Sequence, residues 1–134
     1  MYLPCVDIPL SPEQIAKFSA LALAFIGDAV QTIYVRTRVA LTLDSSLNSM
    51  HSAVSSQIKA TSQSEAVEVI LDELNELELS VYKRARNAKS NTSAKNSSIV
   101  EYRRATGYEA LLGFLYLSGQ KERLEYILMK GTNL

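Results

Sequence analysis

The sequence predicts an all-α domain, and three observations support this fold class. Apolar residues recur at three- and four-residue spacings along most of the 134 residues, no segment shows the period-two alternation of strands, and only five glycines are present. A hydrophobic content of 47% over this length suffices for one core, so a second domain is not expected. We therefore expect residues 1–10 to form an extended lead-in and residues 11–134 to form a single helical bundle.

Capping residues mark where the first helices begin. Ser11, Pro12 and Gln14 form a capped helix start, in which Ser11 and Gln14 can each bond the other's backbone. From about 19 to 43 the chain is dense in Ala, Leu, Ile and Val on every side, which predicts a central helix buried on most of its faces. The sequence Asp44-Ser45-Ser46 interrupts this pattern and offers caps for the next helix.

The rest of the chain continues the helical pattern. Apolar positions 47, 50, 54 and 58, and then 66, 67, 70, 71 and 74, predict two amphipathic helices, and another is expected from about 76 to 88. A polar segment over 87–97 predicts a loop. A long helix from about 99 to 117 should be capped by Ser98 and ended by Gly119 in the left-handed conformation, before a last helix over about 121–129.

Two apolar runs each carry a single acid. Asp28 lies within residues 21–30 and Glu109 within residues 108–115, and on a helix neither acid has a cation three or four residues away. Burying an unpaired carboxylate is costly, so we expect both acids to be buried and to be neutralised by another part of the fold or by a metal ion. Two carboxylates suit Mg²⁺, which keeps several of its waters and leaves positions for phosphate oxygens.

Gly27 and Gly113 accompany the two acids. Because glycine has no side chain, these positions allow helix backbones to approach closely, which would bring Asp28 and Glu109 together. A plainer interpretation stays open, since an isolated acid on a helix is often a partly exposed or arginine-paired structural residue. The two glycines can equally be ordinary packing positions in a bundle.

Charge is balanced overall, with 14 basic and 14 acidic residues, but it is unevenly distributed. An acidic block over 65–78 precedes a stretch that holds half of all the cations: Lys83, Arg84, Arg86, Lys89, Lys95, Arg103 and Arg104. A local basic face of this kind can bind the phosphates of a nucleic acid. Two alternatives remain here, a solvated loop beside a helix end and pairing of Arg103 and Arg104 with the acidic helix.

Several other classes of chemistry are disfavoured. With Cys5 and His51 as its single cysteine and histidine, the chain can form neither an intrachain disulfide nor a Cys/His zinc site. Nothing at the start resembles a signal peptide, and no run of about 18 apolar residues predicts a membrane span. We expect a soluble, intracellular protein with no membrane partner.

Three motifs carry a resemblance to a known family. The run Leu-Ala-Leu-Ala-Phe-Ile-Gly-Asp-Ala-Val over 21–30 resembles the signature helix of the ribonuclease III superfamily, and Tyr-Glu-Ala-Leu-Leu-Gly over 108–113 resembles its second acidic motif. The sequence is most similar to Mini-ribonuclease III, a short bacterial branch without a separate double-stranded-RNA-binding domain. That branch shows the same Leu-Ala-Leu-Ala and an Arg-X-Arg-Asn-Ala-Lys-Ser loop, found here at 84–90. The resemblance covers roughly residues 19–128.

The resemblance implies a homodimeric endoribonuclease with the ribonuclease III helical fold. It implies cleavage of double-stranded RNA with Mg²⁺, for which Mn²⁺ can substitute, giving 5′-phosphate and 3′-hydroxyl ends, and it implies Asp28 and Glu109 as catalytic, metal-binding residues. Maturation of the large-subunit (23S) ribosomal RNA precursor in a bacterial cytoplasm is the implied role, with a ribosomal protein among the candidate partners. RNA contacts are expected from Arg84, Arg86, Asn87, Lys89, Lys95 and Arg104.

The chain departs from the full-length enzymes of the superfamily at three acids. Leu21 and Ala24 occupy positions where those enzymes carry glutamates, and Thr106 occupies the position of an aspartate, although Mini-ribonuclease III shares these absences. The alternative function is a non-catalytic RNA-binding or structural module on the same fold. Retention of both Asp28 and Glu109 favours the enzyme, because a module without catalysis would be free to lose them.

Overall fold

The computed structural model describes residues 9–88 and 98–133, which are α-helical with no strand among them. The expected all-α fold class is therefore confirmed, whereas most of the 1–10 lead-in, Lys89 and Lys95 lie outside the described residues. The elements are α1 (Pro12–Ile15), α2 (Ala20–Thr42), α3 (Leu47–Ile58), α4 (Ala60–Ile70), the 3₁₀ turn η1 (Leu71–Glu73), α5 (Glu76–Arg86), α6 (Ile99–Leu117) and α7 (Lys121–Gly131).

Helix ends follow the capping chemistry of the sequence. Ser11 and Gln14 form the predicted capping box at α1. Ser98 caps α6 through a second box with Glu101, so the predicted bounds of this helix are confirmed. Gly119 follows α6 with φ of 70°, the left-handed conformation that glycine adopts without steric cost. Local sequence thus fixes where the long helices begin and end.

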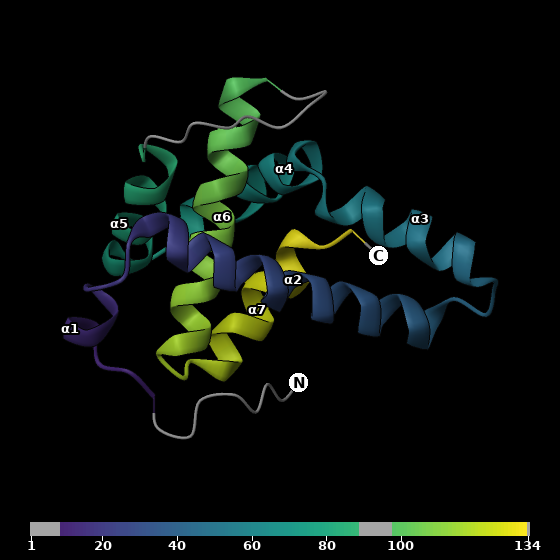
Figure 1. The fold of residues 1–134 in the computed structure, drawn as a ribbon, viewed down its shortest axis with the longest axis horizontal. Helices are drawn as coiled ribbons and strands as arrows, with labels where there is room; N and C mark the ends of the chain where they lie inside the picture. Colours follow the sequence, from purple (N-terminus) through teal and green to yellow (C-terminus); the bar gives the residue numbers. More distant parts are fainter. Residues whose placement is uncertain (1–8, 89–97, 134) are drawn as a thin grey trace.

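The centre of the fold is α6, against which α2, α4, α5 and α7 all pack (Figure 1). From Ala105 to Leu117 it is buried on nearly every side, with Tyr108, Leu111 and Leu115 fully inaccessible. The expectation that the helix over 19–43 is the central one is wrong. Both helices are rich in apolar residues, and periodicity does not reveal which of two such helices the rest of the chain surrounds.

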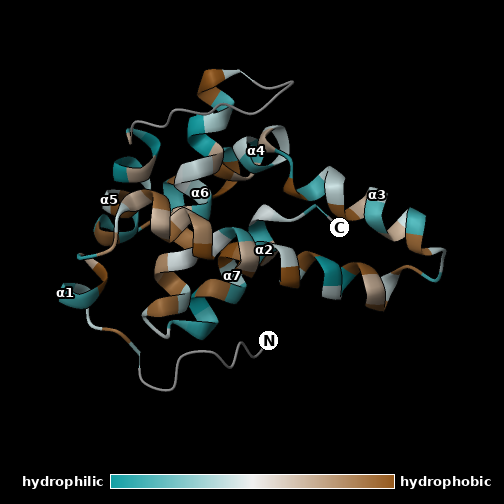
Figure 2. Cartoon of the chain, viewed as in Figure 1, coloured by the Kyte–Doolittle hydropathy of each residue, from teal (hydrophilic) through white to brown (hydrophobic). Residues whose placement is uncertain are grey.

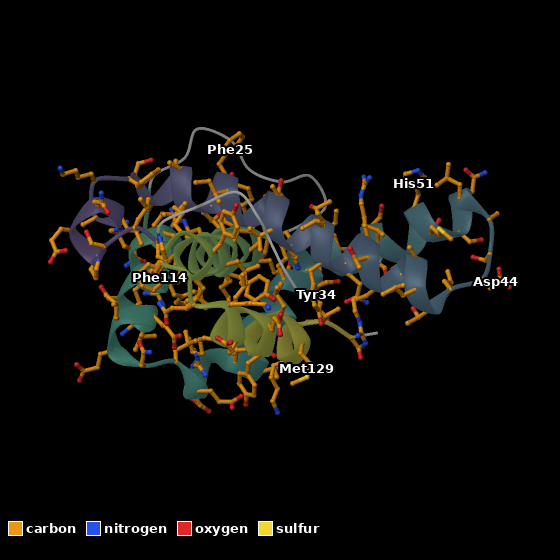
Figure 3. All side chains as sticks on the ribbon, turned by 90° about the horizontal axis from the view of Figure 1, so that it is seen from below. Phe25, Tyr34, Asp44, His51, Phe114 and Met129 are labelled. Carbon is orange, nitrogen blue, oxygen red and sulfur yellow. The ribbon has the colours of Figure 1, made fainter. Side chains whose placement is uncertain are left out.

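One face of α2 is left uncovered by the described residues. Leu21, Phe25, Ala29 and Ile33 recur at every fourth position, which places them along one stripe, and Phe25 is 81% exposed. Figure 3 shows Phe25 pointing away from the other helices, and Figure 2 shows hydrophobic turns along α2. The prediction that this helix is buried on most of its faces is therefore wrong for the isolated chain.

The second half of α2 and all of α3 form a hairpin that projects from the bundle (Figure 1). Val35, Val39 and Val54 are its buried residues, and they form a cluster separate from the main core. Asp44 and His51 lie toward its far end (Figure 3). The hairpin is thus held by a small core of its own.

An ion pair fastens α7 to the start of α5. Glu78 is 1% exposed and accepts two 2.8 Å hydrogen bonds from the Arg123 guanidinium, while also bonding the backbone of Asn75. Burial alone raises the pKa of Glu78, but the bonds from Arg123 and Asn75 outweigh it and hold the pKa below its usual value. This pair is structural, because it joins two helices through a fully satisfied buried carboxylate.

Candidate active site

The two acids singled out by the sequence meet where α2 crosses α6. A Cβ atom placed on Gly27 would lie 1.6 Å from the backbone oxygen of Glu109, and one on Gly113 would lie 2.1 Å from the backbone oxygen of Leu23. The helix backbones are therefore in direct contact at this crossing. The predicted close approach at these glycines is confirmed, and it places Asp28, the residue after Gly27, beside Glu109.

The two acids differ in exposure. Asp28 is exposed, so the expectation that both acids are buried is wrong for this residue, while Glu109 is largely buried beside it. The error has the same origin as the error about α2, since Asp28 lies next to the uncovered stripe of that helix. Solvent thus reaches the pair from one side only.

The carboxyl of Glu109 is strongly perturbed. Its pKa is raised to about 8, chiefly by burial and also by a hydrogen bond to Asp28 and the like charge of Asp28, while a hydrogen bond from Gln63 acts in the opposite direction. In the metal-free protein Glu109 therefore holds a proton at neutral pH. A cation at this point would favour the ionised form and displace that proton.

The donor set suits a hard divalent cation. Two carboxylates with one open side can supply two oxygen ligands to Mg²⁺ and leave its other positions to water or phosphate. Within residues 9–88 and 98–133 no group of three or more His, Cys, Asp or Glu side chains is placed to hold a metal. The two carboxylates present fit a cation that takes two protein oxygens and completes its coordination with water or phosphate.

Two glutamines that the sequence interpretation left out complete this site. Gln63 on α4 donates a 2.6 Å hydrogen bond to Gln31 on α2 and also bonds Glu109. Both side chains are buried, with exposed fractions of 4% for Gln63 and 1% for Gln31. Gln31 could have been predicted as part of the site, because a residue three positions after Asp28 lies on the same face of a helix. Nothing in the sequence connects Gln63 with either acid.

The predicted RNA-contacting residues fall into three groups. Arg84, Arg86 and Asn87 lie at the end of α5, where Arg86 stacks on the Tyr82 ring at 5.6 Å and donates a hydrogen bond to Asn87. Arg104 on α6 pairs with Glu68 of α4 at 3.3 Å, so the alternative left open by the sequence, pairing with the acidic helix, holds for Arg104 in this structure. Lys89 and Lys95 lie outside the described residues.

Three of these residues, Arg86, Asn87 and Arg104, line a surface hollow next to the central helix. The hollow has a volume of about 380 Å³, and its lining residues come from η1, from the end of α5 and from the first turns of α6: Leu71, Tyr82, Arg86, Asn87, Val100, Arg103 and Arg104. Arg104 precedes Glu109 by five residues on one helix, a rise of about 7.5 Å. The basic surface and the acidic pair therefore share the helix α6.

Among the described residues, the helices are all too short or too polar to cross a lipid bilayer.

Comparison with known proteins identifies the family. Residues 21–120 match the family described as "Ribonuclease III domain". A protein of Thermoanaerobacter sp. (strain X514) named "Mini-ribonuclease 3" is 45% identical over 119 residues, covering 89% of this chain and 84% of its own length. A protein of the same name from Staphylococcus aureus is 41% identical over 120 residues, covering 88% of this chain and 90% of its own.

A solved structure agrees with the sequence comparisons. The crystal structure of a protein from Fusobacterium nucleatum superimposes with a TM-score of 0.80 at 30% identity, covering 87% of this chain and 93% of that one. The family match spans both acids and the crossing of α2 with α6. The chain therefore belongs to the Mini-ribonuclease 3 branch of the ribonuclease III family of endoribonucleases.

Proposed function

We propose that this protein cuts double-stranded RNA with a divalent cation, Mg²⁺ or in its place Mn²⁺, held by Asp28 and Glu109. The observation that carries the proposal is the contact of α2 and α6 at Gly27 and Gly113, which sets two carboxylates side by side and raises the pKa of Glu109 to about 8. Two like charges forced together in a partly buried site are stable only with a proton or a cation between them.

The chain's own residues account for the rest of the chemistry. When bound, Mg²⁺ supplies a water of lowered pKa and stabilises charge on the phosphodiester. Asp28 and Glu109 would hold the cation, for which Glu109 would give up its proton, and the phosphate would reach the cation from the solvent-exposed side of Asp28. Attack of water on phosphorus with departure of the 3′ oxygen leaves a 3′-hydroxyl and a 5′-phosphate.

The uncovered stripe of α2 supports a homodimer. Leu21, Phe25, Ala29 and Ile33 form a contiguous apolar surface beside Asp28, and an exposed apolar surface of this kind commonly marks a protein interface. A second copy of the chain would bury it and bring two acidic pairs into one particle, one for each RNA strand. Sedimentation at the monomer mass of 14.8 kDa at micromolar concentration contradicts this part of the proposal.

We assign RNA affinity to the basic residues Arg84, Arg86, Lys89, Lys95 and Arg104, together with the polar residue Asn87. The minor groove of A-form RNA presents phosphates and 2′-hydroxyls, which cations contact without reading the sequence. Glu68, the partner of Arg104, has a side chain that is 67% exposed, and surface ion pairs of this kind are weak. Arg104 can therefore exchange Glu68 for a phosphate.

Reversing charge at the end of α5 is expected to weaken RNA binding without affecting the acids. We expect Arg84→Glu/Arg86→Glu to lower duplex RNA affinity at least about tenfold and to make binding less dependent on salt, because fewer counterions are released. The matched control is Lys17→Glu/Lys121→Glu, a double reversal at exposed lysines of other segments. Filter binding across a salt series measures RNA affinity and its dependence on salt. The assignment would be contradicted if the logarithm of affinity fell with the logarithm of salt concentration at the same slope in both double variants.

The natural substrate that we propose is the precursor of 23S ribosomal RNA, cut in a bacterial cytoplasm, with a ribosomal protein as an assisting partner. The support for this role is membership of the Mini-ribonuclease 3 branch.

The proposed function is tested by incubating the chain with a labelled RNA duplex in Mg²⁺, in Mn²⁺ and in excess chelator. We expect cleavage with either metal, none with chelator, and products that a 5′-phosphate-dependent exonuclease degrades. Binding without cleavage under all three conditions would instead favour a non-catalytic RNA-binding module.

A further inference from the structure

Two buried glutamines lie behind the acidic pair, on the side away from solvent. Gln31 comes from α2 and Gln63 from α4, and Glu109 comes from α6, so the group joins the three helices around the site. No step of the proposed reaction uses either amide. Their exposed fractions of 1% and 4% also keep both amides away from an RNA strand.

Burying two amide side chains such as Gln31 and Gln63 lowers the stability of a core unless their hydrogen bonds are made. An amide moved from water into an apolar interior costs free energy unless its donors and acceptors are bonded, and an apolar pair of the same shape is commonly as stable. The neighbouring positions Val67 and Ile70 of α4 are apolar and fully buried, so this helix can present apolar side chains to the core. The two amides therefore call for a role beyond packing.

Hydrogen bonding fixes the direction of the group. Gln63 Nε2 carries two hydrogens, one of which it donates at 2.6 Å to Gln31 Oε1. A Gln63 amide flipped with Gln31 held as it is would set its own oxygen against the Gln31 oxygen and lose this bond. The orientation that Gln31 selects is thus the one in which Gln63 donates to the Glu109 carboxylate.

We propose that Gln63 is a positioning residue for metal binding: oriented by Gln31, it holds the Glu109 carboxylate beside Asp28 so that both acids face one cation. The proposal rests on the metal site proposed above. Glu109 must keep its carboxylate beside Asp28 to share a cation with it, and a donor at one of its oxygens leaves the other lone pairs free for the metal. Groups that orient metal ligands in this way affect metal affinity about 10- to 100-fold.

The test substitutes methionine, which has nearly the length of glutamine and no donor. We expect Gln63→Met to weaken Mn²⁺ binding by about 10- to 100-fold, as measured by the electron paramagnetic resonance signal of the free ion. The variant should also lower kcat for cleavage of duplex RNA, while KM stays unchanged. Gln31→Met should weaken Mn²⁺ binding by a smaller factor. The double variant should match Gln63→Met, because Gln31 acts only through Gln63.

Control variants separate positioning from folding. Gln57→Met makes the same substitution at a glutamine that bonds the backbone of Asn133, and it should bind Mn²⁺ like the wild type. Thermal unfolding of the Gln31→Met/Gln63→Met double variant should stay near that of the wild type, since both partners are removed together. If Gln63→Met alone fails to fold, the double variant carries the metal-binding measurement.

The outcomes distinguish this inference from the proposed function. Wild-type binding of Mn²⁺ that Asp28→Asn abolishes supports the metal site, and an unchanged Mn²⁺ affinity in Gln63→Met then overturns the role of Gln63. Effects of Gln31→Met and Gln63→Met that multiply in the double variant overturn the claim that Gln31 acts through Gln63. Failure of the wild type to bind Mn²⁺ overturns the proposed function and, with it, this inference.

Discussion

Asp28→Asn and Glu109→Gln are each expected to lower cleavage of duplex RNA by at least about a hundredfold at saturating Mg²⁺. Each substitution removes one of two carboxylate ligands while preserving size, so the remaining acid no longer holds the cation against water. Affinity for uncut RNA should be retained, because the proposed phosphate contacts lie on α5 and the residues after it. Single-turnover cleavage together with filter binding in Ca²⁺ measures the two quantities separately.

The control for these variants is Asp44→Asn, an equivalent change at an exposed acid near the far end of the α2–α3 hairpin (Figure 3). It should cleave at the wild-type rate. Cleavage by Asp28→Asn or Glu109→Gln at a rate close to that of Asp44→Asn would show that the acidic pair is structural.

Glu109→Gln should also stabilise the metal-free protein at alkaline pH. The pKa of Glu109 rises from an ordinary value of 4.5 to about 8 on folding, so the folded state binds its proton more tightly and wild-type stability falls as pH rises from 4.5 to 8. The variant has no such proton to lose, so at pH 9 it should be more stable than the wild type by an amount on the order of 2 kcal/mol. Urea unfolding in chelator at pH 5 and pH 9 measures the free energy of unfolding of both proteins. The same difference between variant and wild type at the two pH values would contradict this prediction.

Gly27→Ala is expected to prevent the native fold from forming. The added Cβ would lie 1.6 Å from the Glu109 backbone oxygen, where no side-chain rotation can relieve the clash, so α2 and α6 must separate at the centre of the core. Overpacking against a side chain commonly costs about 1–3 kcal/mol, and a backbone clash that separates two core helices should exceed this range. Circular dichroism and urea unfolding measure the loss.

Gly107→Ala is the graded control for this prediction. At that position the new Cβ would meet the ring of Tyr82 at 2.6 Å, and a ring can shift where a backbone cannot. We expect Gly107→Ala to fold with reduced stability. A Gly27→Ala variant as stable as Gly107→Ala would mean that the contact between α2 and α6 is looser than described.

Local sequence chemistry was sufficient to predict the helices and one of their contacts. Ser98, Glu101 and Gly119 act on backbone groups a few residues away, so their pattern predicts both ends of α6. Gly27 and Gly113 were informative because a glycine beside a bulky apolar run has few uses other than close approach. The pairing of Asp28 with Glu109 could therefore be expected before any coordinates were known.

What the sequence did not predict depends on residues that are distant along the chain. Whether α2 or α6 is central depends on which other helices surround each one, and both are apolar enough for either role. The exposure of Asp28 follows from the same choice. Gln63 joins Glu109 only because α4 packs across α6, and its own helix carries no local feature that marks it as part of the site.

The crossing of α2 with α6 also determines when the site can exist during synthesis. Asp28 and Glu109 are separated by about 80 residues, so closing this contact requires a long chain segment to be ordered first. Because α6 is also the element on which the other core helices pack, a nascent chain that ends before it lacks the main core and the acidic pair. The acidic pair therefore cannot form until α6 has been synthesised and has packed against α2.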